Sequence, residues 1–421
     1  MPLEFNKLSD QVIRMGAMIE KLDFDLSDRL QIALERFAAA SDIDAVRERI
    51  GLVRQSDISG YRGAAPLDSP LDDPINTIYP PPETAPPATL IAADGSQIYP
   101  NEQSPLHYYV LNIGLFIYYH GQAFIPQQIT QPRLAFHKDH VHDEQKRLVS
   151  NRTVDARRTV AEMQAIAGLA WELRHQAMPP IVALYDNHLL FWANNDVTGS
   201  QQIMRDYHAA LQQLHDLQAN GIQTTLAGYV DNPQRSRVVL RLLYLLSLRD
   251  EHEVKAHETE LAQGGDLEGL RDRHLFNRVL RPGERSAIMV QNSPRNLTYK
   301  QLNPSHEIAF FYVKVGSPQH SSVARVDIPM WVARDPQAVD HLHGLLLAQS
   351  TMQGRTPYPY ALTRADELAY ISGKDKAKLE EMIHIELRRK GIDPLLRSGK
   401  VRGKEVARSE RQSYELRTDL R

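Results

Sequence analysis

Three acidic residues are placed where their side chains could share metal ions. Asp94 ends the apolar run Thr89–Ala93, and Asp186 ends a second apolar run, Ile181–Tyr185. Glu162 lies between them on a long helical pattern. Carboxylates supply the oxygen ligands that Mn²⁺ and Mg²⁺ prefer, and two such ions about 4 Å apart can hold the attacking and leaving oxygens of a phosphodiester. The three residues therefore predict the site of a metal-dependent nuclease.

Glu162 is the member of this set whose position on its element can be worked out. At about 100° per residue, Ile166, Leu169 and Leu173 all fall within about 40° of Glu162 around the helix, so Glu162 belongs to the apolar stripe. A carboxylate on such a stripe is costly unless it is paired or binds a metal. Glu172 lies on the flank of the stripe and is the weaker candidate. The alternative is that Glu162 lies near the helix start, where the stripe emerges into solvent.

The two aspartates also have structural interpretations. Asp94-Gly95 after a strand is a common turn, since glycine accepts a positive φ, and Asp186 followed by Asn187 is equally ambiguous. The order strand-Asp, hairpin, helix-Glu, strand-Asp favours the metal site. It is the order in which RNase H-like folds deliver their ligands, with the first and fourth strands adjacent, and this argument is an analogy between folds.

The rest of the chain supplies the elements that must position these residues. We expect an N-terminal helical segment at 1–60, a proline-rich connector at 61–87 that contains Tyr79–Pro82, a nuclease domain at 88–390 and a basic tail at 391–421. The charged stretch at 250–285 is expected to be exposed. After the strand that ends at Asp94, further strands are expected at 106–119, 122–129, 181–186, 224–230, 308–315 and 322–328, and helices at 154–176, 200–219, 236–248, 335–352, 363–371 and 375–390. Interleaved strands and helices predict an α/β fold, an RNase H-like mixed sheet flanked by helices.

Composition restricts the setting of the protein. The 421 residues carry a formal net charge of −3, so any DNA-binding surface must be local. There is no cysteine, which excludes disulfides and zinc-thiolate sites. The N-terminus lacks the features of a signal peptide, and the run from Tyr108 to Tyr119 is too short to span a bilayer, so we expect a cytoplasmic protein without membrane contact.

Several segments, in this order, resemble the NurA-domain nucleases, which partner the HerA hexameric ATPase. The resemblance runs from about residue 88 to 390. The segments that carry it are Ala93–Ser96, the strand end at Asp186, Gly228–Pro233, Phe310–Lys314 with Ala324–Pro329, and Tyr358-Pro359 through Asp366.

The resemblance implies an RNase H-like core, manganese dependence with two ions (Mn²⁺ or Mg²⁺), and 5′-to-3′ exonuclease and single-strand endonuclease activity on DNA. It also implies a homodimer docked on a HerA-type DNA translocase, with a role in DNA end processing, repair or anti-phage defence. By the same resemblance the metal ligands are Asp94, Glu162 and Asp186, and the family tyrosine is Tyr358. Where the family has a histidine, this chain has Asp366, which could bind metal directly or through water but could not act as an imidazole ligand.

Two other interpretations of the chain stay open. A protein that kept the fold but lost catalysis would be an adaptor that assembles with the ATPase, and Asp366 keeps this alternative open. An RNA-directed nuclease on the same core is the third possibility. The chain has no Gly-x-x-x-x-Gly-Lys-Ser/Thr loop, so a processive role would need a motor from a partner.

Two histidine groups and the tail are weaker candidates. His137, His140 and His142 could bind a transition metal, but a solvated loop is favoured because the region has no helical pattern. His341 and His343 lie two apart on a helix and point to different faces. The tail could contact phosphates, stay solvated, or dock a partner protein.

Overall fold

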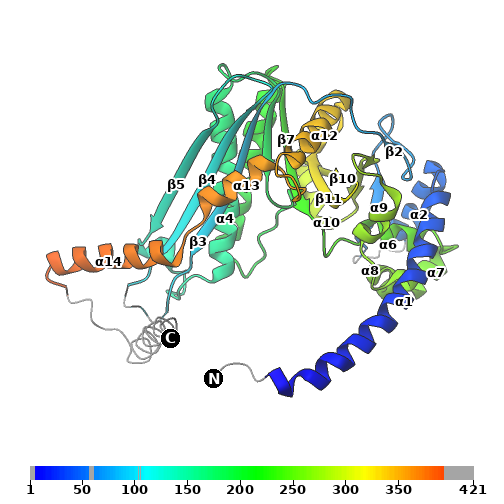
Figure 1. Cartoon of the computed structure of the whole chain (residues 1–421), viewed down its shortest axis with the longest axis horizontal. Coiled ribbons are helices and arrows are strands. Elements are labelled where there is room, and N and C mark those ends of the chain that lie inside the picture. The colour runs from blue at the N-terminus through cyan, green and yellow to red at the C-terminus, as the bar shows by residue number, and fades with distance from the viewer. Residues whose placement is uncertain (1–4, 56–60, 103, 105, 393–421) are drawn as a thin grey trace, which may run out of the picture.

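The computed structural model describes residues 5–55, 61–102, 104 and 106–392. Its centre is a sheet of 11 strands, with helices on both faces (Figure 1). Of the predicted basic tail at 391–421, all but the first two residues lie outside the described part of the chain. No helix within that part is long and apolar enough to cross a bilayer.

Five strands form the half of the sheet that carries the predicted site. They are β3 (Ala88–Ile98), β4 (Tyr109–His120), β5 (Gln127–Ala135), β6 (Ile181–Tyr185) and β7 (Thr224–Asp231). Their order is β5-β4-β3-β6-β7, with β6 parallel to both β3 and β7 and with β4 antiparallel to both β3 and β5. This is the RNase H-like arrangement, and the expected adjacency of the first and fourth strands is confirmed.

Antiparallel strands extend the sheet on the other side of β7. β11 (His320–Pro329) pairs with β7, and β10 (Ile308–Ser317) pairs with β11 as the expected hairpin. Short strands complete this edge: β1 (Ala64–Pro66), β2 (Ile78–Tyr79), β8 (Arg285–Ser286) and β9 (Met289–Gln291). The proline-rich segment 61–87 therefore contributes β1 and β2 to the sheet.

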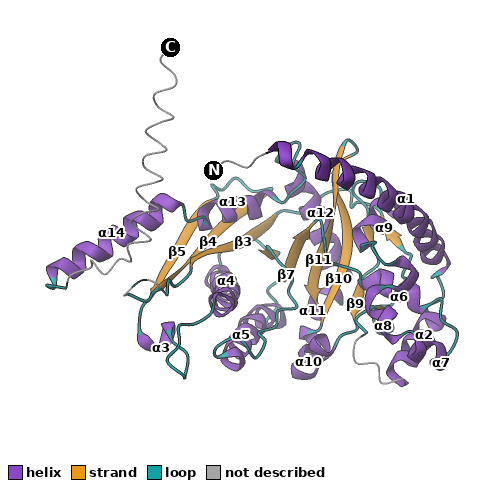
Figure 2. Cartoon of the chain, turned by 90° about the horizontal axis from the view of Figure 1, so that it is seen from below, coloured by secondary structure: helices purple, strands orange, loops and turns teal. Residues whose placement is uncertain are grey.

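Two pairs of helices cover opposite faces of the sheet (Figure 2). One face carries α4 (Asn151–Leu173) and α5 (Ser200–Ala219), and the other carries α12 (Pro336–Thr351) and α13 (Tyr360–Ala369). α4 begins where the Ser150 hydroxyl accepts a hydrogen bond of 3.2 Å from the Thr153 amide, which satisfies one free donor of the first turn. α13 packs very closely on β4, because a Cβ at Gly114 would lie 2.4 Å from the Ala365 carbonyl oxygen.

A second hydrophobic core lies between the N-terminal helices and the middle of the chain. α1 (Ser9–Ala39) packs against α6 (Val238–Leu245) and α9 (Asp272–Val279). α2 (Ile43–Gln55) packs against α7 (Glu251–Ala256), and α8 (Glu258–Gln263) packs against α6 and α7. The rings of Phe37 and Phe276 meet edge to face at 5.7 Å. The expectation that 250–285 is exposed holds for polar positions such as Glu258 and Arg278 but is wrong for the apolar ones. Leu261, Leu267 and Leu275 are at most 1% exposed, because they belong to this second core.

The remaining elements are short, apart from the last helix. α14 (Gly373–Arg389) and the first half of α1 both extend away from the body of the molecule (Figure 1). The shorter elements are α3 (Lys138–Val141), α10 (Pro294–Leu302), α11 (Met330–Ala333) and the 3₁₀ turns Phe5–Lys7, Gly265–Leu267 and Pro304–His306.

Candidate active site

Asp94 and Asp186 lie next to each other on neighbouring parallel strands. The last residue of β6, Tyr185, pairs with Ala93, so Asp94 and Asp186 follow that pair on β3 and β6. The expected strand end at Asp94 and the alternative of a turn at Asp94-Gly95 are both wrong: β3 continues to Ile98, and Asp94 pairs with Gly114 of β4. β6 does stop at Tyr185, so Asp186 ends its strand as predicted.

Successive residues of β3 point to opposite faces of the sheet. A Cβ at Gly95 would lie 2.4 Å from Glu162 Oε1, so position 95 faces α4. Asp94 pairs with Gly114, and a Cβ at Gly114 would contact α13, so the Asp94 side chain points to the α13 face of the sheet. Glu162 is 2% exposed, so its place on the buried stripe is confirmed and the solvent alternative is wrong.

On the α13 face, Asp94 and Asp186 meet the two C-terminal candidates. The Asp366 carboxylate, on the exposed side of α13, lies within hydrogen-bonding reach of Asp94. The Tyr358 hydroxyl is a hydrogen-bond donor to Asp186, and its ring meets the buried Tyr229 ring edge to face at 5.4 Å. Tyr358 is therefore tied to the acidic cluster by its hydroxyl and to the core by its ring.

Burial of the two aspartates raises the pKa of both carboxyl groups. Burial is the largest cause of raising the pKa of Asp94 to about 6; the Gly95 amide lowers this pKa, while the charges of Asp186 and Asp366 raise it further. Burial likewise raises the pKa of Asp186, the Tyr358 hydrogen bond opposes this, and Asp366 and Asp231 add to it. The carboxyl groups therefore hold negative charge that the surrounding residues do not fully compensate.

Glu162 has a cationic neighbour but no complete set of hydrogen bonds. Its burial raises its pKa to about 7, against the opposing effect of Arg158. Glu162 Oε1 lies 3.4 Å from Arg158 Nε, yet neither atom makes a hydrogen bond within the described residues. Arg158 uses Nη1 to donate to the Gly95 carbonyl at 2.8 Å. A buried carboxylate oxygen without a donor is costly, and a cation would satisfy it.

The chemistry of these donors suits a divalent cation, but the structure does not bring the three carboxylates together around one position. In the described part of the chain, no three His, Asp or Glu side chains are already arranged to hold a metal ion. Glu162 approaches β3 from the face opposite to Asp94, through the space that Gly95 leaves without a side chain. The buried, electron-rich oxygens of Asp94, Glu162 and Asp186 are hard ligands of the kind that Mn²⁺ and Mg²⁺ take.

Three residues near the site were missed by the sequence analysis. Arg158 precedes Glu162 by one helical turn, the spacing at which an ion pair forms on a helix. Asp231 ends β7, which runs parallel to β6, so its carboxylate reaches the same edge of the sheet as Asp186. His188 follows Asp186 closely and places Nδ1 3.0 Å from Oδ2 of the buried Asp327.

The histidine groups lie apart from this cluster. His137 and His140 are exposed and bring their rings within 5.8 Å of each other, while His142 Nε2 lies 3.1 Å from His107 Nδ1. The segment forms the short helix α3 rather than a loop throughout. The buried His343 lies 2.8 Å from the Gly283 carbonyl through Nε2, which is a structural contact.

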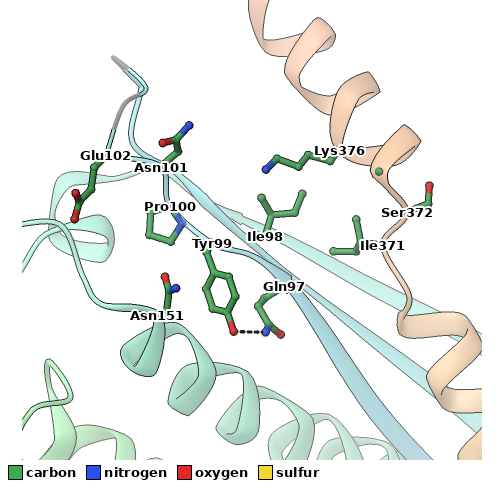
Figure 3. Close-up of a pocket in the computed structure, with 11 residues that line it drawn as sticks. Gln97, Ile98, Tyr99, Pro100, Asn101, Glu102, Asn151, Ile371, Ser372 and Lys376 are labelled. Carbon is green, nitrogen blue, oxygen red and sulfur yellow. Dashed lines mark hydrogen bonds between the residues drawn. The ribbon is translucent and has the colours of Figure 1, made fainter. Parts of the chain in front are cut away.

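A separate cavity of about 680 Å³ lies at the far end of β3 (Figure 3). Tyr99 and Gln97 line it from β3 and the following loop, Asn151 from the start of α4, and Lys376 from α14. The Gln97 amide donates to the Tyr99 hydroxyl at 2.7 Å. None of the five predicted site residues lines this cavity, so it is not part of the acidic site.

The chain matches a known domain family and is similar to several solved structures. Residues 88–371 match the NurA domain model. Similar solved structures include the NurA nuclease from Sulfolobus solfataricus, at 14% identity over 91% of this chain and 98% of that chain, with a TM-score of 0.44. Drosophila Piwi is similar at 12% identity over 68% of this chain and 30% of that chain, with a TM-score of 0.29. Human ENDOV is similar at 10% identity over 78% of this chain and 97% of that chain, with a TM-score of 0.26.

A search of curated proteins finds no match. The match to the domain model takes in more than half of the sequence and includes Asp94, Glu162, Asp186, Tyr358 and Asp366. The expected resemblance is therefore confirmed, and the chain belongs to the NurA domain family of nucleases.

Proposed function

We propose that this protein is a divalent-metal-dependent DNA nuclease, with 5′-to-3′ exonuclease and single-strand endonuclease activity. It works with a HerA-type hexameric ATPase on DNA ends, in repair or anti-phage defence. The observation that carries the proposal is the register of β3 and β6, which puts Asp94 beside Asp186 where Tyr358 and Asp366 also meet. We expect the protein in the cytoplasm, where such DNA is found.

In this proposal Asp94 and Asp186 hold the metal, Glu162 completes the ligand set from the α4 face, and Asp366 adds a fourth carboxylate. The metal is Mn²⁺ or Mg²⁺, with two ions expected. When bound, such ions lower the pKa of water and offset negative charge on the phosphodiester oxygens. The position of Asp366 beside Asp94 supports its use in place of the family histidine.

The protein side chains prepare the hydrolysis in other ways. The Tyr358 hydroxyl orients Asp186 and favours its ionised form, since a donated hydrogen bond stabilises a carboxylate. Arg158 holds the Gly95 carbonyl and favours the charged form of Glu162 against the effect of burial. Water adds to phosphorus, the bond to the 3′ oxygen breaks, and that oxygen takes a proton, which leaves a 5′-phosphate and a 3′-hydroxyl.

The partners are proposed from exposed apolar surface. Val12, Ile13, Met15 and Met18 on the projecting part of α1 are each more than half exposed. Exposed apolar residues that gather on one element are typical of protein contacts. We assign this surface to the homodimer or to docking on the ATPase, which supplies the motor that this chain's sequence lacks.

The nuclease assay uses the full chain with labelled single-stranded DNA, double-stranded DNA and RNA. With Mn²⁺ or Mg²⁺ we expect cleavage of DNA, no cleavage in EDTA, and loss of at least 100-fold in the Asp94→Asn variant. The matched control is Asp28→Asn, because Asp28 is exposed on α1 far along the chain from the site. Absence of DNA cleavage with either metal, with and without the ATPase, would favour the adaptor alternative instead. Cleavage of RNA alone would favour the RNA-directed alternative.

A further inference from the structure

We propose that a pocket of arginines beside the acidic cluster binds a phosphate group of a DNA strand. The arginine pocket is a cavity of about 480 Å³ between the loop after β7, the start of α6 and the loop after β9. This inference rests on the proposed function in taking DNA as the ligand, but it concerns residues outside the hydrolytic site. The arginines that line the pocket are Arg62, Arg235, Arg237, Arg241, Arg295 and Arg325.

The positive charge of the arginine pocket is not balanced from within the protein. Asp231 is the one acidic residue among the residues that line it. The buried Asp327 is already engaged by Arg325 Nε at 2.7 Å and by His188 Nδ1 at 3.0 Å. The buried Asp272 accepts the Val238 amide at 2.7 Å at the start of α6. Asp327 is therefore already paired, and the charge of Asp272, which raises the pKa of Arg241, is outweighed there by burial and Arg237.

Mutual repulsion among the guanidinium groups supports the same conclusion. The pKa of Arg241 is lowered by burial and then by the charge of Arg237; Asp272 opposes this, and Arg62 lowers the pKa further. Burial also lowers the pKa of Arg295, and Arg62 adds to this. Groups of like charge held together in this way gain free energy when an anion enters between them. Their planar forks suit phosphate in particular.

Several of these side chains are free to turn toward a ligand. Arg62 and Arg235 are exposed and make no hydrogen bond or ion pair with any other residue that the structure describes. Arg241 is held by a backbone carbonyl, Ala262 O, at 2.8 Å, which orients the group without removing its charge. The amides at the start of α6 are already capped by Asp272, so the arginines must supply the anion contacts.

The arginine pocket adjoins the acidic cluster. Asp231 lines the pocket and also raises the pKa of Asp186, so it lies between the two sites. His188, which follows Asp186 on the chain, lines the pocket too. A DNA strand that is bound with one phosphodiester at Asp94 and Asp186 can therefore place a neighbouring phosphate among the arginines. That phosphate is either an internal backbone phosphate or the phosphate at a 5′ end.

Binding of labelled single-stranded oligonucleotides, measured by fluorescence anisotropy in EDTA, tests the pocket without cleavage. The pocket variant is Arg62→Ala with Arg235→Ala. Both positions are exposed, so we expect the fold to stay intact, which thermal denaturation checks. The charge-matched control is Arg249→Ala with Arg281→Ala, both exposed and outside the pocket. We expect about tenfold weaker binding for the pocket variant and a salt slope smaller by about one. The control variant should bind as the unchanged protein does.

Oligonucleotides with a 5′-phosphate or a 5′-hydroxyl separate the two sources of phosphate. If the pocket variant loses affinity only for the 5′-phosphorylated oligonucleotide, the pocket binds the 5′-terminal phosphate. If it loses affinity equally for both oligonucleotides, the pocket binds a backbone phosphate. The proposal is overturned if the pocket variant binds both strands as tightly as the unchanged protein, if the control loses as much, or if the unchanged protein binds neither strand. Pocket-dependent binding without metal-dependent cleavage would refute the proposed nuclease and leave the pocket standing.

Discussion

The carboxylates of Asp94 and Asp186 are neighbours because Ala93 pairs with Tyr185 in the parallel register of β3 and β6. β3 continues past this pair while β6 stops, so one acid lies within a strand and the other lies at a strand end. Burial raises the pKa of both groups, and the charge of Asp186 raises the pKa of Asp94 further. A bound cation would therefore stabilise the charged forms of both carboxyl groups.

Replacing Gly95 with alanine tests the approach of Glu162 to β3. The new Cβ would lie 2.4 Å from Glu162 Oε1 and must displace that side chain. We expect a loss of about 1–3 kcal/mol in the free energy of unfolding and a strong loss of cleavage. The control is Gly168→Ala on α4, where a Cβ meets nothing within 4 Å, so the substitution should stabilise the helix by about 0.5–1 kcal/mol. Equal effects of both substitutions on cleavage would contradict a role for the Glu162 approach.

The Tyr358→Phe variant removes the hydroxyl from Asp186 and keeps the ring on Tyr229. The lost hydrogen bond to a charged group contributes about 1.5–3 kcal/mol, so cleavage should fall by about tenfold or more. The hydroxyl lowers the pKa of Asp186, so its removal raises that pKa and moves the acid side of the pH–rate profile to higher pH. Tyr360→Phe, which keeps the ring packed on Phe116, is the control. An unmoved profile in Tyr358→Phe would show that the hydroxyl does not act on Asp186.

The Asp366→Asn variant should move the same profile in the opposite direction. Asp366 raises the pKa of Asp94, so removing its charge lowers that pKa and extends cleavage to lower pH. The side chain is exposed on α13, and the fold should keep its stability. Rates measured from pH 5 to pH 8 at subsaturating Mn²⁺, where protonation of Asp94 competes with metal binding, decide the matter, and a shift toward higher pH would count against the assigned contact.

His306 should make the protein sensitive to acid. Its pKa is lowered to about 4, first by burial and then by His215 and His208, with Asp216 opposing, so the folded state keeps the ring neutral while the unfolded state protonates it below its ordinary 6.5. Stability is therefore lost as the pH falls from about 6.5 toward 4, by about 2 kcal/mol at pH 5.

Thermal denaturation at pH 7.5 and pH 5 measures this loss. His306→Gln should narrow the difference in Tm between the two pH values, because the substituted side chain does not titrate. His252→Gln, at an exposed position on α7, is the control and should leave the difference unchanged. A difference in Tm that is the same in all three proteins would exclude His306 as the cause.

Local patterns predicted the elements of the site better than their contacts. The apolar runs before Asp94 and Asp186 predicted β3 and β6, and the stripe around Glu162 predicted its burial. The register of β3 on β6 and the continuation of β3 through Gly95 depend on pairing with distant strands, and no local pattern reports this. The segment 250–285 looked exposed because its apolar residues fall on short helices that elements distant in the sequence cover: α1, α2, β10 and β11.

Binding of Mn²⁺ tests the central claim most directly, since it asks whether Asp94 and Asp186 form one cation site. Free Mn²⁺ can be measured by electron paramagnetic resonance during titration of the full chain, its Asp94→Asn and Asp186→Asn variants, and the Asp28→Asn control. We predict saturable binding in the unchanged protein and in Asp28→Asn, and loss of at least tenfold in affinity in each of the two site variants. Unchanged Mn²⁺ affinity in both site variants would contradict the account.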